Sequence, residues 1–208
     1  ENTYENWIKF VEQPEQEKAH PVSGPLISIL MPVYNTPSKW LNKAIQSVQN
    51  QDYTNWELCI ANDNSTDVKI QPMLENKAAN DSRIKVIHRE KNGHISAASN
   101  SALSLATGEF CALLDHDDEL SSNALTEIAK AINKNPQAQI IYSDEDKIDT
   151  VGKRSTPYFK PDWNPDLLRS QNYFCHLSVY KHSLLSQIKG FRTGFEGAQD
   201  WDLSLIHI

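Results

Sequence analysis

Residues 26–48 read LISILMPVYNTPSKWLNKAIQSV, a pattern typical of a buried strand followed by an amphipathic helix. The first eight, LISILMPV, form an apolar run of strand length. Thr36 and Pro37 are predicted to start the helix, with Thr36 as the N-cap and Pro37 at the first helical position. Apolar residues then recur at helical spacing, at Trp40, Leu41, Ala44, Ile45 and Val48. Such a strand–helix unit is the building block of an α/β domain.

The same alternation continues as far as Tyr142. Four more apolar strands are predicted, with the sequences WELCIA, IKVIH, FCALLD and QIIYS. Helices are predicted between them at about 68–80, at about 95–106 with Gly108 closing the helix, and around 125–132 with Ser121 or Ser122 as the N-cap. Strands that are apolar throughout need cover on both faces, which predicts a mostly parallel sheet flanked by helices. Such sheets bind their ligands at the carboxyl ends of the strands.

Outside this region the pattern changes. Residues 1–24 are polar apart from one amphipathic piece with Tyr4, Trp7, Ile8 and Val11. We interpret them as a helix and a linker that join the domain, residues 25–208, to further domains upstream in a longer chain. Residues 143–165 are rich in charge, proline and aromatics and are expected to form a long functional loop or an irregular excursion over the sheet edge.

Three more elements are predicted beyond that loop: a short helix PDLLRSQ, a strand FCHLSVY and a glycine-rich stretch, GFRTGFEGAQDWD. The chain stops early in a helix that WDLSLI begins. We therefore expect a single α/β domain whose C-terminal part is missing.

Composition and charge argue against several classes of protein. With 20 basic and 27 acidic residues the formal charge is −7, and no run of Lys and Arg is available to neutralise a nucleic-acid backbone. Cys59, Cys111 and Cys175 are odd in number and lie in apolar stretches, which indicates buried free thiols in a reducing compartment. The sequence shows neither a signal peptide nor an apolar run long enough to span a membrane. A cytoplasmic location is expected, with docking on the inner face of the membrane left open.

The strand FCALLD runs directly into an acidic cluster, DHDDE at residues 115–119. Like charges packed this closely repel one another unless a cation lies among them, and carboxylate oxygens are the ligands that Mg²⁺ and Mn²⁺ prefer. Asp115 and Asp117, two positions apart, are the candidate ligands. A solvated acidic turn that caps a helix explains the residues alone equally well.

Two loops that follow neighbouring strands carry further candidates. Asp63, in ANDNSTD at residues 61–67, can accept a hydrogen bond from a base or ribose, although an ordinary Asx-rich turn explains the same residues. Tyr34, after the first strand, offers an aromatic face to a nucleobase, and its alternative is a place in the core. Both loops are expected to line one crevice.

Four segments in a fixed order carry a more specific resemblance: ISILMPVYN, ELCIANDNSTD, NGHISAASNSALSLATGEFCALLDHDDEL and GFRTGFEGAQDWDL. Together they resemble the family 2 inverting glycosyltransferases, which have the Rossmann-like GT-A fold. The stretches YSDEDKID and PYFKPDWNPDLL are similar to the branch that builds O-antigen and other bacterial surface polysaccharides, rhamnosyltransferases among them. The resemblance covers the chain from about Leu26 to its end.

The resemblance implies a site for a UDP- or dTDP-linked sugar and a divalent metal, Mn²⁺ or Mg²⁺. The residues that it places around the nucleotide are Pro32, Val33, Tyr34, Asn35, Asp63, Gly93, Asn100, Asp115 and His116. Asp115-His116-Asp117 takes the place of the DxD motif, with Asp117 and Asp115 at the metal, and Asp200 matches the catalytic base. Two positions depart from the family pattern: Gln199 replaces an acid, and Ser99 replaces an arginine, which puts diphosphate contacts from that helix in doubt.

These roles predict a transfer with inversion. Asp200 would take the proton of the acceptor hydroxyl while the metal offsets the charge on the leaving diphosphate. The acceptor is expected to be a saccharide or a lipid-linked saccharide, bound on aromatic side chains chosen from Tyr158, Phe159, Trp163 and Trp201. His176 is expected in the core or behind the ligands, and His94 is a weak candidate for a phosphate contact.

Two other functions compete with this interpretation. A nucleotidyltransferase would need a glycine-rich basic loop after the first strand, and PVYNTPSKW has no glycine and a single lysine. A non-catalytic nucleotide-binding module of a larger synthase would keep the fold and the nucleotide site but transfer no sugar.

Overall fold

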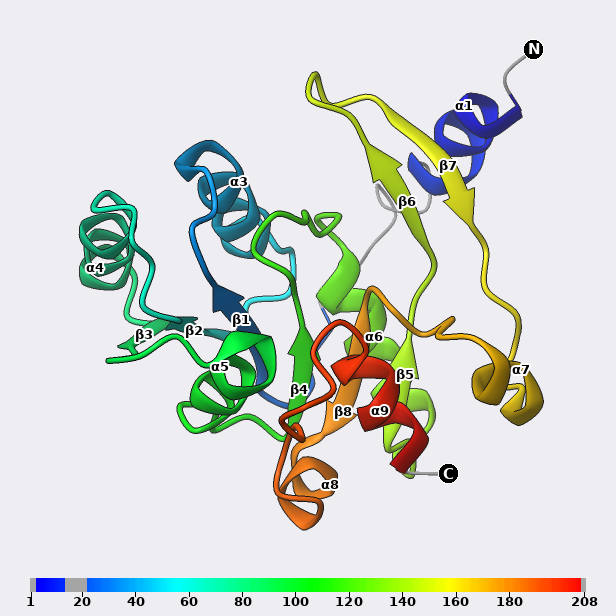
Figure 1. Cartoon of the computed structure of the whole chain (residues 1–208). Coiled ribbons are helices and arrows are strands. Elements are labelled where there is room, and N and C mark those ends of the chain that lie inside the picture. The colour runs from blue at the N-terminus through cyan, green and yellow to red at the C-terminus, as the bar shows by residue number, and fades with distance from the viewer. Residues whose placement is uncertain (1–2, 14–21, 207–208) are drawn as a thin grey trace.

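A six-stranded sheet lies at the centre of the molecule, with the strand order β3-β2-β1-β4-β8-β5 (Figure 1). The computed structural model describes residues 3–13 and 22–206, so most of the predicted linker lies outside the described residues. The strands are β1 Ile27–Val33, β2 Trp56–Asn62, β3 Ile84–His88, β4 Phe110–Leu113, β5 Ile140–Tyr142 and β8 Ser178–Lys181. β1 pairs in parallel with β2 and β4, and β2 with β3, whereas β8 is antiparallel to β4 and β5. The predicted mostly parallel sheet is confirmed.

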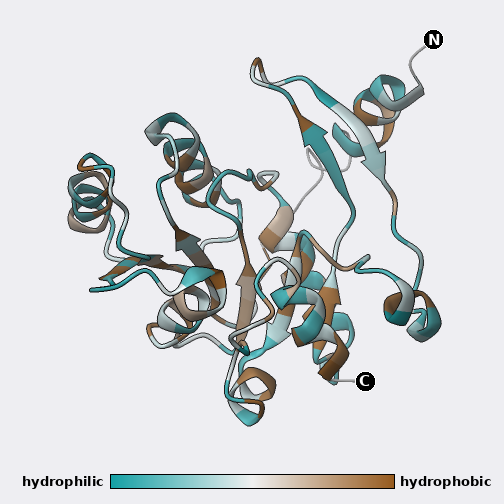
Figure 2. Cartoon of the chain, in the orientation of Figure 1, coloured by the Kyte–Doolittle hydropathy of each residue, from teal (hydrophilic) through white to brown (hydrophobic). Residues whose placement is uncertain are grey.

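Helices cover both faces of this sheet (Figure 1). One layer contains α3 Ser38–Gln49, α4 Ile70–Asn80 and α6 Ala124–Lys134, and the other contains α5 His94–Leu103, α8 His182–Gln187 and α9 Gln199–Ile206. Successive side chains of β1 point to opposite faces of the sheet. Ile29 and Met31 pack in the core on the side of the first layer, and Leu30 packs in the core on the side of the second. Figure 2 shows hydrophobic residues along β4, between the two layers. Burial of both faces explains the uninterrupted apolar runs of the sequence.

The predicted cap of the first helix is wrong. α3 begins at Ser38 with Pro37 as its N-cap, in an extended conformation with ψ of 128° and no side-chain capping bond. Thr36 does not cap the helix, because its side chain is buried and its Oγ1 has no hydrogen-bond partner among the described residues. The extended Pro37 delays the helix start by one residue.

The predicted cap of the helix around 125–132 is also wrong. α6 begins at Ala124, and Asn123 occupies the N-cap position in place of either serine. Gln51, which lies just after the C-terminal end of α3, binds the backbone at this helix start: its Oε1 accepts from Leu125 N at 2.9 Å, and its Nε2 donates to the Ser121 carbonyl at 2.6 Å. A side chain distant in the sequence thus replaces the local cap.

The predicted strand FCHLSVY is shorter than expected, because β8 begins only at Ser178. The residues before it form a loop whose backbone groups bond to side chains: Leu177 N donates to Ser143 Oγ at 3.1 Å, and Lys160 Nζ donates to the carbonyls of Phe174 and His176. Cys175 therefore lies half-buried in a loop. Cys59 and Cys111 are buried in strands as predicted, and burial raises the pKa of each thiol to about 12.

Residues 143–165, expected to be irregular, contain an antiparallel hairpin, β6 Glu145–Ile148 and β7 Arg154–Tyr158, which is followed by the short predicted helix α7 Pro165–Ser170. The N-terminal helix, α1 Thr3–Trp7 continued by η1 Ile8–Glu12, packs against this hairpin (Figure 1). Arg154 joins them, since its Nη1 lies 2.7 Å from Glu12 Oε2 and its Nε lies 2.5 Å from Asp146 Oδ2. The described part of the predicted N-terminal helix and linker is thus docked on this hairpin.

Replacing Arg154 with methionine is expected to release this helix. The side chain makes several charge-assisted hydrogen bonds, and hydrogen bonds to charged groups contribute about 1.5–3 kcal/mol each, so local opening should become at least about tenfold more frequent. Native-state hydrogen exchange of residues 4–12 measures this. Lys153→Met is the control. It removes a more exposed ion pair, between Lys153 of the same hairpin and Glu5 of the helix, and should change the exchange little. Unchanged exchange in Arg154→Met would mean that other contacts, such as the packing of Tyr4 and Trp7 against Phe159, hold the helix.

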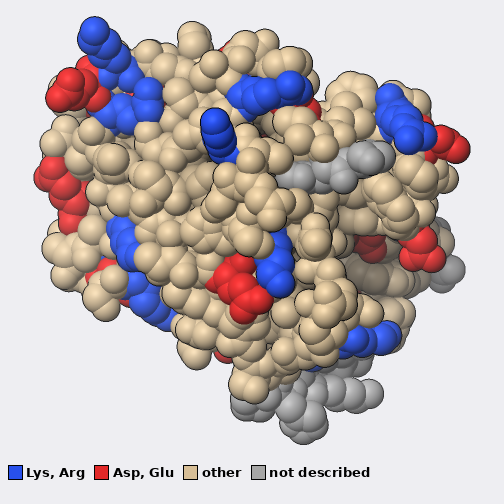
Figure 3. All heavy atoms as spheres, turned by 90° about the horizontal axis from the view of Figure 1, so that it is seen from below, with Lys and Arg blue, Asp and Glu red and all other residues tan. Residues whose placement is uncertain are grey.

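The surface carries mixed charge. Figure 3 shows acidic and basic side chains scattered in small groups over the face seen from below. Within the described ranges, no helix combines the length and the apolar character that crossing a bilayer requires.

Candidate functional site

A pocket of about 360 Å³ opens at the carboxyl ends of β1 and β4. Its walls come from segments far apart in the sequence and include Pro32, Leu114, Asp115, His176, Gln199 and Asp200. β1 and β4 are neighbours in the sheet, so the loops that follow them share one edge. This is the location that the parallel strands predicted.

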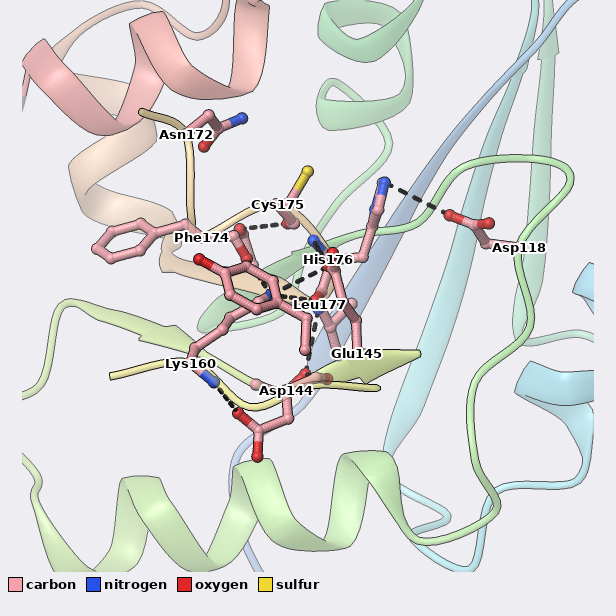
Figure 4. Close-up of polar contacts among 12 residues, drawn as sticks. Asp118, Asp144, Glu145, Lys160, Asn172, Phe174, Cys175, His176 and Leu177 are labelled. Atoms are coloured by element: carbon pink, nitrogen blue, oxygen red, sulfur yellow. Dashed lines mark hydrogen bonds and ion pairs between the residues drawn. The ribbon is translucent and has the colours of Figure 1, made fainter. Parts of the chain in front are cut away.

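Three potential metal ligands lie together in the turn after β4 and in the loop before β8. His176 Nε2 is 3.8 Å from Asp115 Oδ2 and 3.5 Å from Asp118 Oδ2 (Figure 4). One ligand atom from each of the three residues lies within 4.8 Å of the others. Asp117 is exposed and is not part of this group. The sequence thus predicted one of the three, Asp115, as a metal ligand.

The two carboxyl groups of this cluster are destabilised as anions. Loss of hydration raises the pKa of Asp115, and the charges of Asp117 and Asp200 raise it further against the opposing effect of His176 and His116. Burial likewise raises the pKa of Asp118, with a contribution from Asp115. A cation placed among these oxygens would offset the repulsion and favour the charged form of both groups.

Helix α9, in the second helix layer, brings Asp200 into the same pocket. Asp200 lies in the first turn of α9, and Asn172 Nδ2 donates a hydrogen bond to its Oδ2 at 2.7 Å. Its neighbours fix the helix around it: Trp201 Nε1 donates to the Leu168 carbonyl at 2.6 Å, and Asp202 pairs with Arg192. The carboxylate that the resemblance implied as a base is therefore held between two anchored residues.

Asp63 is buried and already bonded within the protein. Its Oδ1 accepts from Arg89 Nε at 2.7 Å and from the Gly93 amide at 3.0 Å. These bonds connect the loops that follow β2 and β3 at the edge of the sheet. Sequence reasoning placed Asp63 and Gly93 near the nucleotide but missed Arg89, although Arg89 directly follows the strand IKVIH. Nucleotide contacts by Asp63 and Gly93 stay predictions.

The end of β1 and the loop after it carry four of the predicted nucleotide contacts. Pro32 lines the pocket, whereas the Val33 side chain packs in the core. Tyr34 is 45% exposed, so the alternative of a core position is wrong and its ring is accessible to a ligand. Asn35 braces the loop, since its Oδ1 accepts from the Thr66 amide at 2.8 Å.

Two other predicted nucleotide contacts have structural partners. The amide group of Asn100 binds the backbone of Phe191 in both directions, with Nδ2 to O and N to Oδ1 distances of 2.8 Å. His116 Nδ1 lies 3.1 Å from the Pro32 carbonyl, which links the ends of β4 and β1. Ser99, on the same helix as Asn100, lines the pocket. Ligand contacts by Asn100 and His116 stay predictions.

Comparison with known sequences identifies relatives. The profile described as Glycosyl transferase family 2 matches residues 28–189. The chain is 51% identical over 183 residues to the uncharacterized protein y4gI of Sinorhizobium fredii, covering 88% of this chain and 20% of that protein. It is 40% identical over 181 residues to the O-antigen biosynthesis protein RfbC of Myxococcus xanthus, covering 87% of this chain and 14% of that protein. The chain thus spans a fifth or less of the length of these two relatives.

A solved structure shares the fold. S. aureus TarS in complex with UDP superposes with a TM-score of 0.69 at 23% sequence identity, covering 86% of this chain and 53% of that chain. At this identity the likeness extends to the fold alone.

Proposed function

The chain belongs to glycosyl transferase family 2 and has a GT-A fold, and from this premise we propose that it transfers a sugar from a nucleoside diphosphate to a saccharide acceptor with inversion. The relative named for O-antigen biosynthesis supports a place in bacterial surface polysaccharide synthesis. One observation carries the proposal: Asp115 of the metal-ligand cluster and Asp200 line the same pocket. Such a pocket offers groups for both ends of the reaction, the leaving diphosphate and the attacking hydroxyl.

The donor set of Asp115, Asp118 and His176 fits a divalent cation. Two carboxylates suit Mg²⁺ and Mn²⁺, and an imidazole suits transition metals, so Mn²⁺ satisfies both kinds of ligand. When bound, the ion would offset the negative charge that grows on the leaving diphosphate. Asp117, the other ligand implied by the resemblance, lies exposed on the same turn and is proposed to join the ion when the diphosphate is present.

Asp200 is proposed as the base. The acceptor hydroxyl oxygen forms a bond to the anomeric carbon, the bond from that carbon to the diphosphate oxygen breaks, and the hydroxyl proton passes to Asp200. The bond from Asn172 occupies Oδ2 and fixes the carboxylate plane, which leaves Oδ1 to receive the proton.

The acceptor is proposed to bind over Trp163. This ring is 54% exposed and packs at 5.9 Å against Phe174, in the segment that leads to His176. Of the other predicted aromatics, Phe159 packs edge-on against Trp7, and Trp201 is bonded to the Leu168 carbonyl. Trp163 is the most exposed of these three rings, so its face is proposed to take the sugar.

Calorimetric titration with UDP and dTDP, with and without Mn²⁺, tests the proposal. We expect binding of one nucleotide that depends on Mn²⁺ and that Asp118→Ala and Asp117→Ala each weaken at least about tenfold, because each removes a ligand. Glu119→Ala, which alters an exposed acid of the same run paired with Lys43, is the matched control. Equal binding in the presence of EDTA would exclude the metal, and no binding of either nucleotide would favour the non-catalytic alternative.

A further inference from the structure

Lys160 is a fully buried lysine in the segment between β7 and α7. Its side chain is 0% exposed, although lysine is almost never fully buried unless it is paired. The ammonium group has three acceptors: Glu145 Oε2 at 3.1 Å, the Phe174 carbonyl at 2.7 Å and the His176 carbonyl at 2.6 Å (Figure 4). An ammonium group has three protons to donate, so each proton can meet one acceptor.

The partner Glu145 holds the same loop from the other side. Its Oε2 accepts a hydrogen bond from the His176 amide at 3.1 Å. The Lys160–Glu145 pair thus binds both the N–H and the C=O of His176. Residues 174–177 precede β8 and belong to no strand, so the pair supplies hydrogen-bond partners for the backbone groups of His176.

Burying the ammonium group of Lys160 costs free energy, and these hydrogen bonds oppose that cost. Burial lowers the pKa of Lys160, and Glu145 acts against this effect. A buried pair of this kind is weak evidence for a gain in stability, because replacing it with apolar residues is often neutral. What the pair supplies here is a fixed backbone position for one residue, His176, whose imidazole faces Asp115 and Asp118.

We infer that Lys160 is a positioning residue for the cation site, which acts by fixing the backbone of His176 so that Nε2 stays beside Asp115 and Asp118. This inference rests on the proposed function, since it assumes that the cluster holds the cation. Lys160 and Asp118 lie on opposite sides of His176 (Figure 4). Groups that orient metal ligands from behind typically affect metal affinity by about 10- to 100-fold.

Two measurements on Lys160→Met test the inference. Methionine keeps a long apolar side chain but removes all three donors. Mn²⁺ affinity, measured by electron paramagnetic resonance without nucleotide, should fall by about 10- to 100-fold. Hydrogen exchange of the His176 and Leu177 amides should accelerate by at least about tenfold, whereas exchange in β1 and β2 should stay unchanged.

The controls separate positioning from a general loss of stability. Lys153→Met, at a 63% exposed lysine of the same hairpin, should leave both measurements unchanged. Combining Lys160→Met with His176→Ala should lower Mn²⁺ affinity no further than His176→Ala alone, since Lys160 acts through His176. If Lys160→Met fails to fold, Glu145→Gln is measured in the same way and should show a smaller loss of the same kind.

The outcomes distinguish the two proposals. Wild-type protein that binds Mn²⁺, with Lys160→Met unchanged in affinity and in exchange, overturns the positioning inference and leaves the proposed function intact. An additive loss in the double variant also overturns it. Wild-type protein that binds no Mn²⁺ overturns the proposed metal site and, with it, the positioning inference, whatever the exchange rates of the loop.

Discussion

Replacing Asp200 with asparagine is expected to lower kcat by about 10²- to 10⁴-fold, the usual contribution of a positioned general base. The substitution keeps the size and planar shape of the side chain, and the Asn172 amide at 2.7 Å still finds an oxygen to bind. What it removes is the ability to take a proton from the acceptor hydroxyl. Nucleotide affinity should change by no more than about twofold, because the lost step belongs to the transition state.

Initial rates of sugar transfer, together with calorimetric nucleotide binding, measure this effect. Asp202→Asn is the matched control, since Asp202 lies in the same turn of α9 but pairs with Arg192 away from the pocket walls. We expect it to lower the free energy of unfolding while the folded protein keeps most of its kcat. Retention of more than about a tenth of wild-type kcat in Asp200→Asn would contradict the assignment of the base.

The core of this fold could be predicted from sequence because periodicity reports burial. Every residue of β1 and β2 is buried, and a strand with two covered faces has few positions for polar residues, so its sequence is mostly apolar. The hairpin β6–β7 gave no such signal. Its sequences, EDKI and RSTPY, are partly exposed, and the pairing is supported by an N-terminal helix that lies about 140 residues earlier in the chain.

The candidate site was predictable only in part, for geometric reasons. Asp115 follows a buried strand, so its place at the sheet edge is set by local sequence. Which acid accompanies it is decided by the turn: the Asp118 amide donates to the Asp115 carbonyl at 3.3 Å, and this turn brings Asp118 back toward Asp115 while Asp117 points outward.

His176 illustrates a contribution that spacing cannot reveal. The antiparallel register of β4 and β8 pairs Leu113 with Ser178, so the residues just before β8 lie beside those just after β4. An interpretation that assumed a strand through His176 placed its side chain in the core or behind the metal ligands. Only the register of a distant strand brings this imidazole to the acids.

At the opposite end of the sheet, a buried carboxylate joins three chain segments. Glu57, in β2, is 5% exposed and accepts hydrogen bonds from Ser28 Oγ at 2.6 Å and from the Thr107 amide at 2.5 Å, and it pairs with Lys85 Nζ at 2.6 Å. Burial by itself would raise the pKa of Glu57, but these donors outweigh it and lower the pKa from 4.5 to about 2. The folded protein therefore stabilises the charged form of Glu57.

This shift predicts a specific loss of stability in acid. A folded-state pKa of about 2 against an unfolded value of 4.5 contributes about 3 kcal/mol, fully present above pH 4.5 and lost as the pH falls toward 2. Glu57→Gln cannot make this contribution. Urea unfolding should therefore show the variant about 3 kcal/mol less stable at pH 7, with the two proteins converging as the pH falls below 4. Other acids with lowered pKa values, such as Asp81, act equally in both proteins and cancel in the difference. A difference in the free energy of unfolding that stays constant from pH 7 to pH 3 would show that Glu57 stabilises the protein through its packing and not through its charge.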